Sequence, residues 1–536
     1  MTILLLEPNY KNKYPPLGLM KIATFHKQLG DSVVFSKGEN KLLSEQKWDR
    51  IYINSLFTFE WNATEKMIKF AYTLTKEKNI IYIGGIAATL IPDVIVASHS
   101  EINVVDGLLN SPGKLDLPND EIIDSLPPDY SILDQIDYKY PTHDAYFTYA
   151  TRGCGMNCSF CAVQKLEPQF IDYICVSDQV NNVKKQCGEK KNLMLMDNNV
   201  LKSPRLKDII DDIIKLGFGK GEKYKNSTTG KTVKRYVDFN QGLDANFLTQ
   251  EKAEQLSRIE LNPVRIAFDH IQQQNKYEKA IRTCFDAGLR SFSNYLLYNT
   301  NDASWKGQSY GADTPEDLYN RLLFNVELCE NLQKELNNRN IDEKVQIYSF
   351  PMRYIPLEDT KRGYIGTHWN KKILRAIQVF LTPTQGKGVS SHSFFKASFG
   401  QSLDEYLLAI YMPENILVRR GTYTPRKKDD QKTIEEKLDK SKFNSNLVTE
   451  WNQLYSLLRE NRLWDNFIKV YVEDNTFSFN TLSEIQNPLE KAMYLYYIPV
   501  NKFNNNYQRL PENEKHFIRT YLKTNAKYLS ELLKTD

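Results

Sequence analysis

Three cysteines spaced C-x3-C-x2-C constrain this chain more than any other feature of its sequence. They are Cys154, Cys158 and Cys161, and they follow a short apolar stretch. Thiolates gathered so closely surround one compact centre, because thiolate is the ligand that iron-sulfur clusters and soft metal ions select. No fourth cysteine follows at a matching spacing. A closed zinc site or a fully ligated cubane takes four protein ligands, so three leave one metal position open.

The composition describes a folded chain of several domains. Its 536 residues exceed one ordinary core, so two or three domains are expected. A hydrophobic content of 41%, a charged content of 25% and a net charge of +4 exclude the disordered and fibrous classes. No stretch is apolar for long enough to predict a membrane span. Seven cysteines, three of them clustered, and a start without a basic segment predict a cytoplasmic protein.

Apolar runs that alternate with helical patterns predict an α/β domain over residues 1–110. Strands are expected at 3–6, 32–35, 51–53 and 80–83, with helices at 17–29 and 62–78. Such alternation specifies a Rossmann-like, open parallel sheet. The next segment, 111–143, is rich in Pro, Asp and Ser and predicts an extended linker.

Strand, loop and helix alternate again over residues 144–357. Six strands are expected, at 146–150, 193–196, 236–239, 264–268, 292–298 and 345–350. Thr314 followed by Pro315 predicts the start of a helix between the last two strands. Residues 358–536 are mostly amphipathic helix, which predicts a helical C-terminal domain.

The cysteine spacing, with Phe160 directly before the third cysteine and an aromatic strand at 145–150, resembles the radical S-adenosylmethionine (radical SAM) superfamily. The resemblance implies a partial (β/α)6 barrel of the TIM type whose first unit carries the cysteine loop. It also implies that Cys154, Cys158 and Cys161 hold three irons of a [4Fe-4S] cluster, and that the amino and carboxylate groups of SAM chelate the fourth iron.

The reaction that the resemblance implies is reductive cleavage of SAM to a 5′-deoxyadenosyl radical. That radical would abstract hydrogen from a substrate, which the sequence does not identify. The resemblance further implies an electron donor of the flavodoxin or ferredoxin type.

Polar residues follow successive strands of the predicted barrel. Because functional residues of such barrels lie at the carboxyl ends of the strands, we expect them to share one cavity. With Phe160, the predicted cofactor-binding residues are Asp197, Asn198, Gln241, Asp244, Asp269 and Arg353. The Gly-Gly-Glu-like motif of the family is replaced by Met-Asp-Asn-Asn at 196–199, so individual roles stay open. Each residue could instead cap a helix or form a turn.

The N-terminal domain resembles the cobalamin-binding-like domain of many radical SAM enzymes. The resemblance rests on the entry to the first helix at 15–19, on Ser55-Leu56 and on Gly84-Gly85. The Asp-x-His-x-x-Gly signature that replaces the lower cobalt ligand is absent. Cobalamin is thus a possible cofactor that we do not expect, and a cobalamin-dependent radical SAM methyltransferase is the alternative function.

Several of these features also have an interpretation that involves no catalysis. The three cysteines could bind zinc with a distant His or Cys, such as Cys175, in a non-catalytic metal-binding interaction protein. The lysine-rich segment 220–234 predicts a solvated hairpin, and without interleaved stacking aromatics it predicts no nucleic-acid partner. Cys284 and Cys329 lie on apolar helix stripes and are expected to pack as small hydrophobic residues.

Overall fold

The N-terminal domain is a parallel sheet in the order β2-β1-β3-β4-β5. The computed structural model describes residues 1–117, 121–226, 229–305, 308–384, 388–389, 391–421, 423, 425 and 429–534. The strands of this sheet are β1 (Thr2–Glu7), β2 (Ser32–Lys37), β3 (Arg50–Asn54), β4 (Ile81–Gly84) and β5 (Asn103–Val104). Its helices are α1 (Leu17–Gln28), α2 (Trp61–Leu74), α3 (Ile86–Leu90) and α4 (Pro92–Ser98). The predicted open α/β sheet is confirmed, with β5 as an additional edge strand.

The central strand β1 is buried on both faces, as continuous aliphatic sequence in a parallel sheet requires. Ile3 and Leu5 face the core that contains α1. Leu4 and Leu6 face the opposite core, which contains α2. Helices therefore cover both faces of the sheet, and the carboxyl ends of its strands are left for contacts with the rest of the chain.

The described part of the segment 111–143 packs against the N-terminal domain and does not run free as the predicted extended linker would. Its described part forms two 3-10 turns, Ile123–Ser125 and Tyr130–Gln135. The Tyr130 hydroxyl donates a hydrogen bond to the carbonyl of Ala145 at 2.9 Å. Tyr140 is buried and donates to the Glu7 carboxylate at the end of β1. The linker thus fixes the N-terminal sheet to the first strand of the next domain.

Six parallel strands form the partial barrel that the sequence predicts. They are β6 (Ala145–Thr148), β7 (Asn192–Leu195), β10 (Val237–Phe239), β11 (Val264–Arg265), β12 (Ser291–Tyr298) and β15 (Gln346–Arg353). Two sheets, β6-β7-β10 and β11-β12-β15, are joined by parallel bridges from Val237 to Leu261 and from Leu243 to Ile266. The carboxyl ends of all six strands consequently meet at one end of the barrel.

Helices cover the outside of the barrel: α6 (Val176–Cys187), α7 (Leu206–Ile213), α8 (Gln250–Ser257), α9 (Gln274–Asp286) and α10 (Pro315–Asn338). Helix α10 begins with the predicted signal, because Thr314 and Asp317 form a reciprocal capping box and Pro315 takes the first helical position. Cys284 of α9 is fully buried in the core, as expected.

Two hairpins project from the barrel at opposite ends. The predicted lysine-rich hairpin forms from β8 (Lys223–Lys225) and β9 (Thr232–Lys234), although residues 227–228 of that prediction lie outside the described part. It directly precedes β10, so it lies at the amino ends of the strands. A second hairpin, β13 (Ala303–Trp305) with β14 (Gln308–Tyr310), follows β12 at the carboxyl ends and was not predicted.

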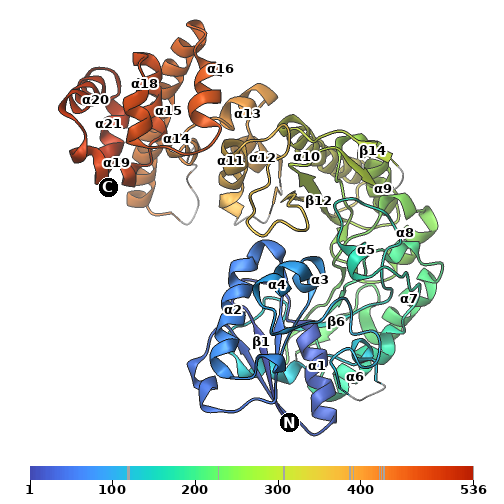
Figure 1. Cartoon of the computed structure of the whole chain (residues 1–536). Helices are drawn as coiled ribbons and strands as arrows, with labels where there is room; N and C mark the ends of the chain where they lie inside the picture. The colour runs from blue at the N-terminus through green and yellow to red at the C-terminus, as the bar shows by residue number, and fades with distance from the viewer. Residues whose placement is uncertain are drawn as a thin grey trace.

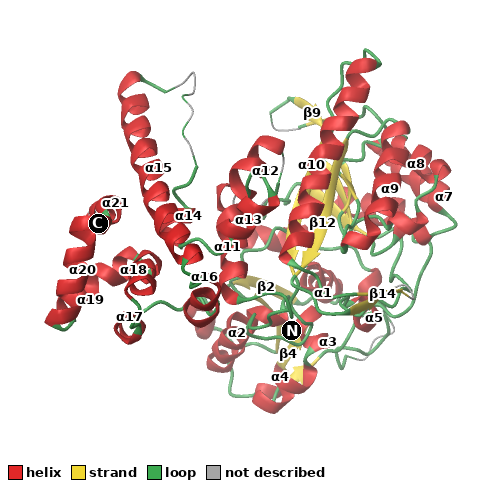
Figure 2. Ribbon diagram, turned by 90° about the horizontal axis from the view of Figure 1, so that it is seen from above, coloured by secondary structure: helices red, strands yellow, loops and turns green. Residues whose placement is uncertain are grey.

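The C-terminal region is helical, as the sequence predicts. Its described helices are α11 (Lys371–Leu381), α12 (His392–Phe399), α13 (Leu403–Ala409), α14 (Glu414–Leu417), α15 (Gln431–Glu460), α16 (Trp464–Phe467), α17 (Phe479–Glu484), α18 (Pro488–Tyr497), α19 (Val500–Asn506), α20 (Glu512–Asn525) and α21 (Lys527–Lys534). Figure 1 shows α15–α21, in orange and red, grouped apart from the N-terminal sheet in blue. Figure 2 shows α12 and α13 beside α10 of the barrel. No helix among the described residues is both long and apolar enough to cross a membrane.

Candidate active site

The cysteine loop leaves the barrel at the carboxyl end of β6. Its first residues are held by the buried carboxylate of Asp197, which follows β7. Asp197 accepts hydrogen bonds from the backbone N–H groups of Ala150 and Thr151 and, at 2.7 Å, from the Thr151 hydroxyl. Burial raises the pKa of Asp197 to about 6, against the effect of these donors. Asp197 therefore holds the backbone at the start of the cysteine loop. It does not line the cavity that the cysteines line.

Two glycines allow the loop to turn so tightly. Gly153 and Gly155 both have positive φ, at 68° and 65°. A side chain at Gly153 would collide with the carbonyl oxygen of Gln169, and one at Gly155 would collide with the ammonium of Lys202. Only glycine fits such backbone positions without strain. The glycines therefore belong to the geometry that brings the cysteines together.

The three cysteines line one cavity of about 380 Å³ at the carboxyl ends of the strands. Phe160 lines it as well, together with the predicted strand-end residues Asn198, Gln241, Asp244 and Asp269. All three cysteines are half-buried, and none of them is in a disulfide. Burial raises the pKa of Cys161, and the neighbouring Cys154 and Asp269 raise it further. The structure thus brings together all of the predicted site residues except Asp197 and Arg353.

Arg353 lies at the end of β15, and its guanidinium turns away from this cavity. It donates hydrogen bonds to the carbonyls of Arg362, at 3.1 Å, and Tyr364, at 2.7 Å. Arg353 therefore holds the chain that follows β15, and its predicted contact with a cofactor has no support in this geometry.

Glu167 and Lys202 of the site were not predicted, and Asn199, which belongs to the predicted strand-end segment 196–199, had been given no role of its own. Glu167 accepts from the backbone N–H of Gly153 at 2.7 Å and from the Asn198 amide at 2.9 Å. Asn199 donates to the Cys154 sulfur at 3.4 Å, and Lys202 donates to the Cys154 carbonyl at 3.2 Å. The Asn-Asn pair after β7 was a signal for Asn199, but nothing in the local sequence points to the other two.

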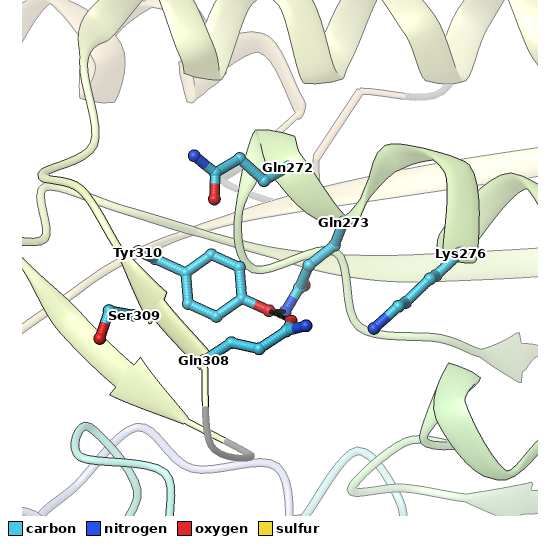
Figure 3. Close-up of a pocket in the computed structure, with 6 residues that line it drawn as sticks. All are labelled: Gln272, Gln273, Lys276, Gln308, Ser309 and Tyr310. Atoms are coloured by element: carbon cyan, nitrogen blue, oxygen red, sulfur yellow. Dashed lines mark hydrogen bonds between the residues drawn. The ribbon is translucent and has the colours of Figure 1, made fainter.

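The cavity continues into an amide-rich extension of about 410 Å³ (Figure 3). Its walls are the 3-10 turn Ile271–Gln273, the start of α9 and the hairpin β13–β14. They supply Gln272, Gln273, Lys276, Gln308, Ser309 and Tyr310. The Tyr310 hydroxyl donates to Gln308 at 2.7 Å. The hairpin is tied to the cysteine loop because the Ser159 N–H donates to the Ser304 carbonyl at 3.0 Å. One continuous space therefore runs from the cysteines to Lys276.

The donor set fits an iron-sulfur cluster with one open iron. Three thiols come from one loop, and the space before them is lined by carboxylate and amide oxygens. In the described part of the chain, no group of three or more His, Cys, Asp or Glu side chains is arranged to hold a single metal ion. Cys175, the predicted fourth ligand of the zinc alternative, lies beside Tyr173 at the start of α6. It is absent from the lining of the cavity.

A second cavity, of about 170 Å³, lies between the N-terminal sheet and the cysteine loop. Residues from the ends of β3 and β4, including Asn54 and Gly84, line it on one side, and Tyr149 and Arg152 line it on the other. Arg152 is only 4% exposed, yet its Nε and Nη1 make no hydrogen bond with any residue that the structure describes. Its guanidinium stacks on Tyr149 at 3.9 Å and pairs with Asp124 at 3.0 Å.

Comparisons with known proteins give structural similarity only. The sequence matches no family model, and a search of curated proteins gives no match. The chain is similar to TsrM from Kitasatospora setae, which is described as a radical SAM methyltransferase with cobalamin and a [4Fe-4S] cluster bound. The two share 13% sequence identity and superpose with a TM-score of 0.44 over 67% of this chain and 77% of that one. It is also similar to OxsB, described as a cobalamin-dependent SAM radical enzyme, with 12% identity and a TM-score of 0.41 over 99% of this chain and 83% of that one. Similarity this distant does not establish a shared activity, so the function has to follow from the site itself.

Proposed function

We propose that this protein is a radical SAM enzyme whose Cys154, Cys158 and Cys161 hold a [4Fe-4S] cluster. One observation carries the proposal: three thiols of a single loop open into the cavity that the polar strand ends of the barrel also line. Three thiolates leave one iron without a protein ligand, which is the position that a chelating cofactor would take. When bound, the reduced cluster would supply the electron that breaks the sulfonium carbon-sulfur bond of SAM.

The strand-end residues would hold and orient SAM. Asp244 and Asp269 supply acceptors for an ammonium and for ribose hydroxyls, while Asn198 and Gln241 supply both donors and acceptors. Phe160 supplies an apolar wall between the second and third cysteines. A cavity of about 380 Å³ is within the ~300–1,000 Å³ range of small-molecule sites. Fixed polar groups in such a cavity orient a charged ligand more strongly than water would.

The substrate would enter through the amide-rich extension. Its glutamine amides and the ammonium of Lys276 suit a polar substrate that presents acceptor oxygens (Figure 3). The hairpin β13–β14 would keep bulk water from the reacting atoms. The proposal includes an electron donor of the flavodoxin or ferredoxin type and a reducing cytoplasmic setting, in which the thiols stay available for a cluster.

The experiment that tests this function measures 5′-deoxyadenosine after anaerobic reconstitution with iron and sulfide, in the presence of dithionite and SAM. Wild type should release it slowly without a substrate. The Cys154→Ala/Cys158→Ala/Cys161→Ala variant should release none, and Asp269→Asn should release less while keeping its iron. Cys284→Ala, a buried cysteine outside the site, is the matched control and should behave as wild type. Equal release by the triple variant and wild type would refute the proposal.

A second candidate function, a cobalamin-dependent radical SAM methyltransferase, is favoured by the interdomain cavity. The sequence-based expectation against cobalamin has no support here, because the carboxyl edge of the N-terminal sheet opens into a cavity that faces the cysteine loop. A cavity of about 170 Å³ would hold only a side chain at one end of a corrinoid, where the Arg152 guanidinium suits an amide or phosphate oxygen. Purification with hydroxocobalamin, followed by cobalt analysis and a visible spectrum, tests it: one cobalt per chain supports this function, and no retained corrinoid excludes it.

A further inference from the structure

A short turn behind Cys154 directs two hydrogen-bond donors at that one cysteine. The turn begins at Asn199, after β7, and ends at Lys202, whose backbone N–H donates to the Asn199 carbonyl at 3.2 Å. The Asn199 amide lies 3.4 Å from the Cys154 sulfur, and the Lys202 ammonium lies 3.2 Å from the Cys154 carbonyl oxygen. The side chains of this turn therefore donate hydrogen bonds to Cys154.

Both side chains are held in place by their surroundings. Asn199 is 1% exposed, and its Nδ2 also donates to Asp244 at 3.4 Å. The Lys202 ammonium lies 4.7 Å from the ring centre of Phe170. It also occupies the space where a side chain at position 155 would begin, so Gly155 is required for the ammonium to approach. The surroundings of the Lys202 ammonium therefore hold it beside Cys154, and the contact is not that of a freely rotating surface lysine.

We infer that the turn 199–202 raises the reduction potential of the cluster, and the inference rests on the proposed [4Fe-4S] site. A donor to a ligating sulfur, and a cation beside the ligating residue, both stabilise negative charge on the thiolate. The reduced cluster carries one more negative charge than the oxidised cluster, so both groups favour the reduced state. Hydrogen bonds to sulfur and net local charge are the known determinants of such potentials.

A purely structural role for the turn predicts something different. If Asn199 and Lys202 only shape the loop, their replacement changes cluster content or stability and leaves the potential of assembled clusters unchanged. The variants should therefore remove the donor or the charge while keeping volume. Asn199→Leu removes the amide, Lys202→Met removes the charge, and Lys202→Arg keeps it. Lys207→Met removes a charge from an exposed position of α7 and is the matched control.

The measurement is an anaerobic redox titration of the cluster signal by electron paramagnetic resonance, with iron and sulfide counted on each sample. Asn199→Leu and Lys202→Met should each lower the reduction equilibrium constant about tenfold, a shift of ~59 mV to more negative potential for one electron. Lys202→Arg should titrate close to wild type, as should Lys207→Met. Iron and sulfide contents should stay at the wild-type level.

Two results distinguish a failure of this inference from a failure of the proposed function. If wild type assembles no cluster, the proposed function itself fails. If the variants assemble full clusters that titrate with wild type, the function stands and the inference is wrong. Should Asn199→Leu lose its cluster, the comparison of Lys202→Met with Lys202→Arg decides, because the half-buried ammonium is not needed to fill the core.

Discussion

At the scale of single residues, Asp197 is the position where the structure changes the expected role most. Its carboxylate is fully buried and bound to the start of the cysteine loop, whereas the sequence placed it in contact with SAM. A residue that follows a strand can turn into the barrel mouth or back into the loop layer, and the sequence alone does not distinguish the two. Asn198, one residue later, lines the cavity.

This placement predicts a pH dependence. The pKa of Asp197 is raised to about 6 from 3.8, so the folded protein holds the proton more tightly than the unfolded chain does. The raised pKa contributes stability below about pH 4 that is lost as the pH rises towards 6. In urea denaturation, the free energy of unfolding of wild type should fall over this range by about 3 kcal/mol relative to Asp197→Asn. A constant difference between the two proteins would show that the carboxyl is not buried as described.

The residues of the site show which of its features could be predicted from the sequence. Spacing predicted that the three cysteines lie together, and the convergence of strand ends predicted that Gln241, Asp244 and Asp269 line the same cavity, because parallel strands must end together. Glu167 and Lys202 were missed because their partners, Gly153 and Cys154, are set by loop geometry. Nothing in the local pattern encodes such a contact.

At the scale of elements, the hairpin β13–β14 is the feature of the site that periodicity did not reveal. Each of its strands is three residues long, too short for an alternating pattern to be significant. The longer strands and the capped helix α10 were predictable because their signals extend over many residues or include a reciprocal cap. The hairpin nevertheless forms a wall of the amide-rich extension and contacts the cysteine loop.

Removing this hairpin should expose the cluster. Replacement of residues 303–310 by a short Gly-Ser linker should accelerate the loss of visible absorbance when the reconstituted protein meets air, by about tenfold or more. The control replaces residues 223–234, the hairpin at the amino ends of the barrel strands, and should leave the rate unchanged. Equal bleaching rates for both variants would contradict the role assigned to β13–β14.

At the scale of the whole molecule, the linker makes the N-terminal domain and the barrel one unit. Lys37 and Glu7 form a buried ion pair at 2.9 Å, and Tyr140 of the linker donates to the same carboxylate. The sequence predicted an extended linker because Pro and Asp mark irregular backbone. It could not show that the tyrosine side chain reaches a strand 133 positions away.

Tyr140→Phe should therefore destabilise both domains together. Loss of a hydrogen bond to a buried charged group costs about 1.5–3 kcal/mol, and far-UV circular dichroism and cluster absorbance should report the same, single unfolding transition. Tyr138→Phe removes only a hydrogen bond to the backbone carbonyl of Asn12 and should cost about 1 kcal/mol. Separate transitions for the two probes in wild type would argue against a single unit.

The open iron is the central claim, and its most direct measurement is the paramagnetic resonance spectrum of the dithionite-reduced protein with and without SAM. A [4Fe-4S] cluster held by Cys154, Cys158 and Cys161 alone should give a signal that changes when SAM binds the fourth iron. The change should be retained in Cys284→Ala. A reduced protein with no cluster signal, or a signal that saturating SAM leaves unaltered, would contradict the account.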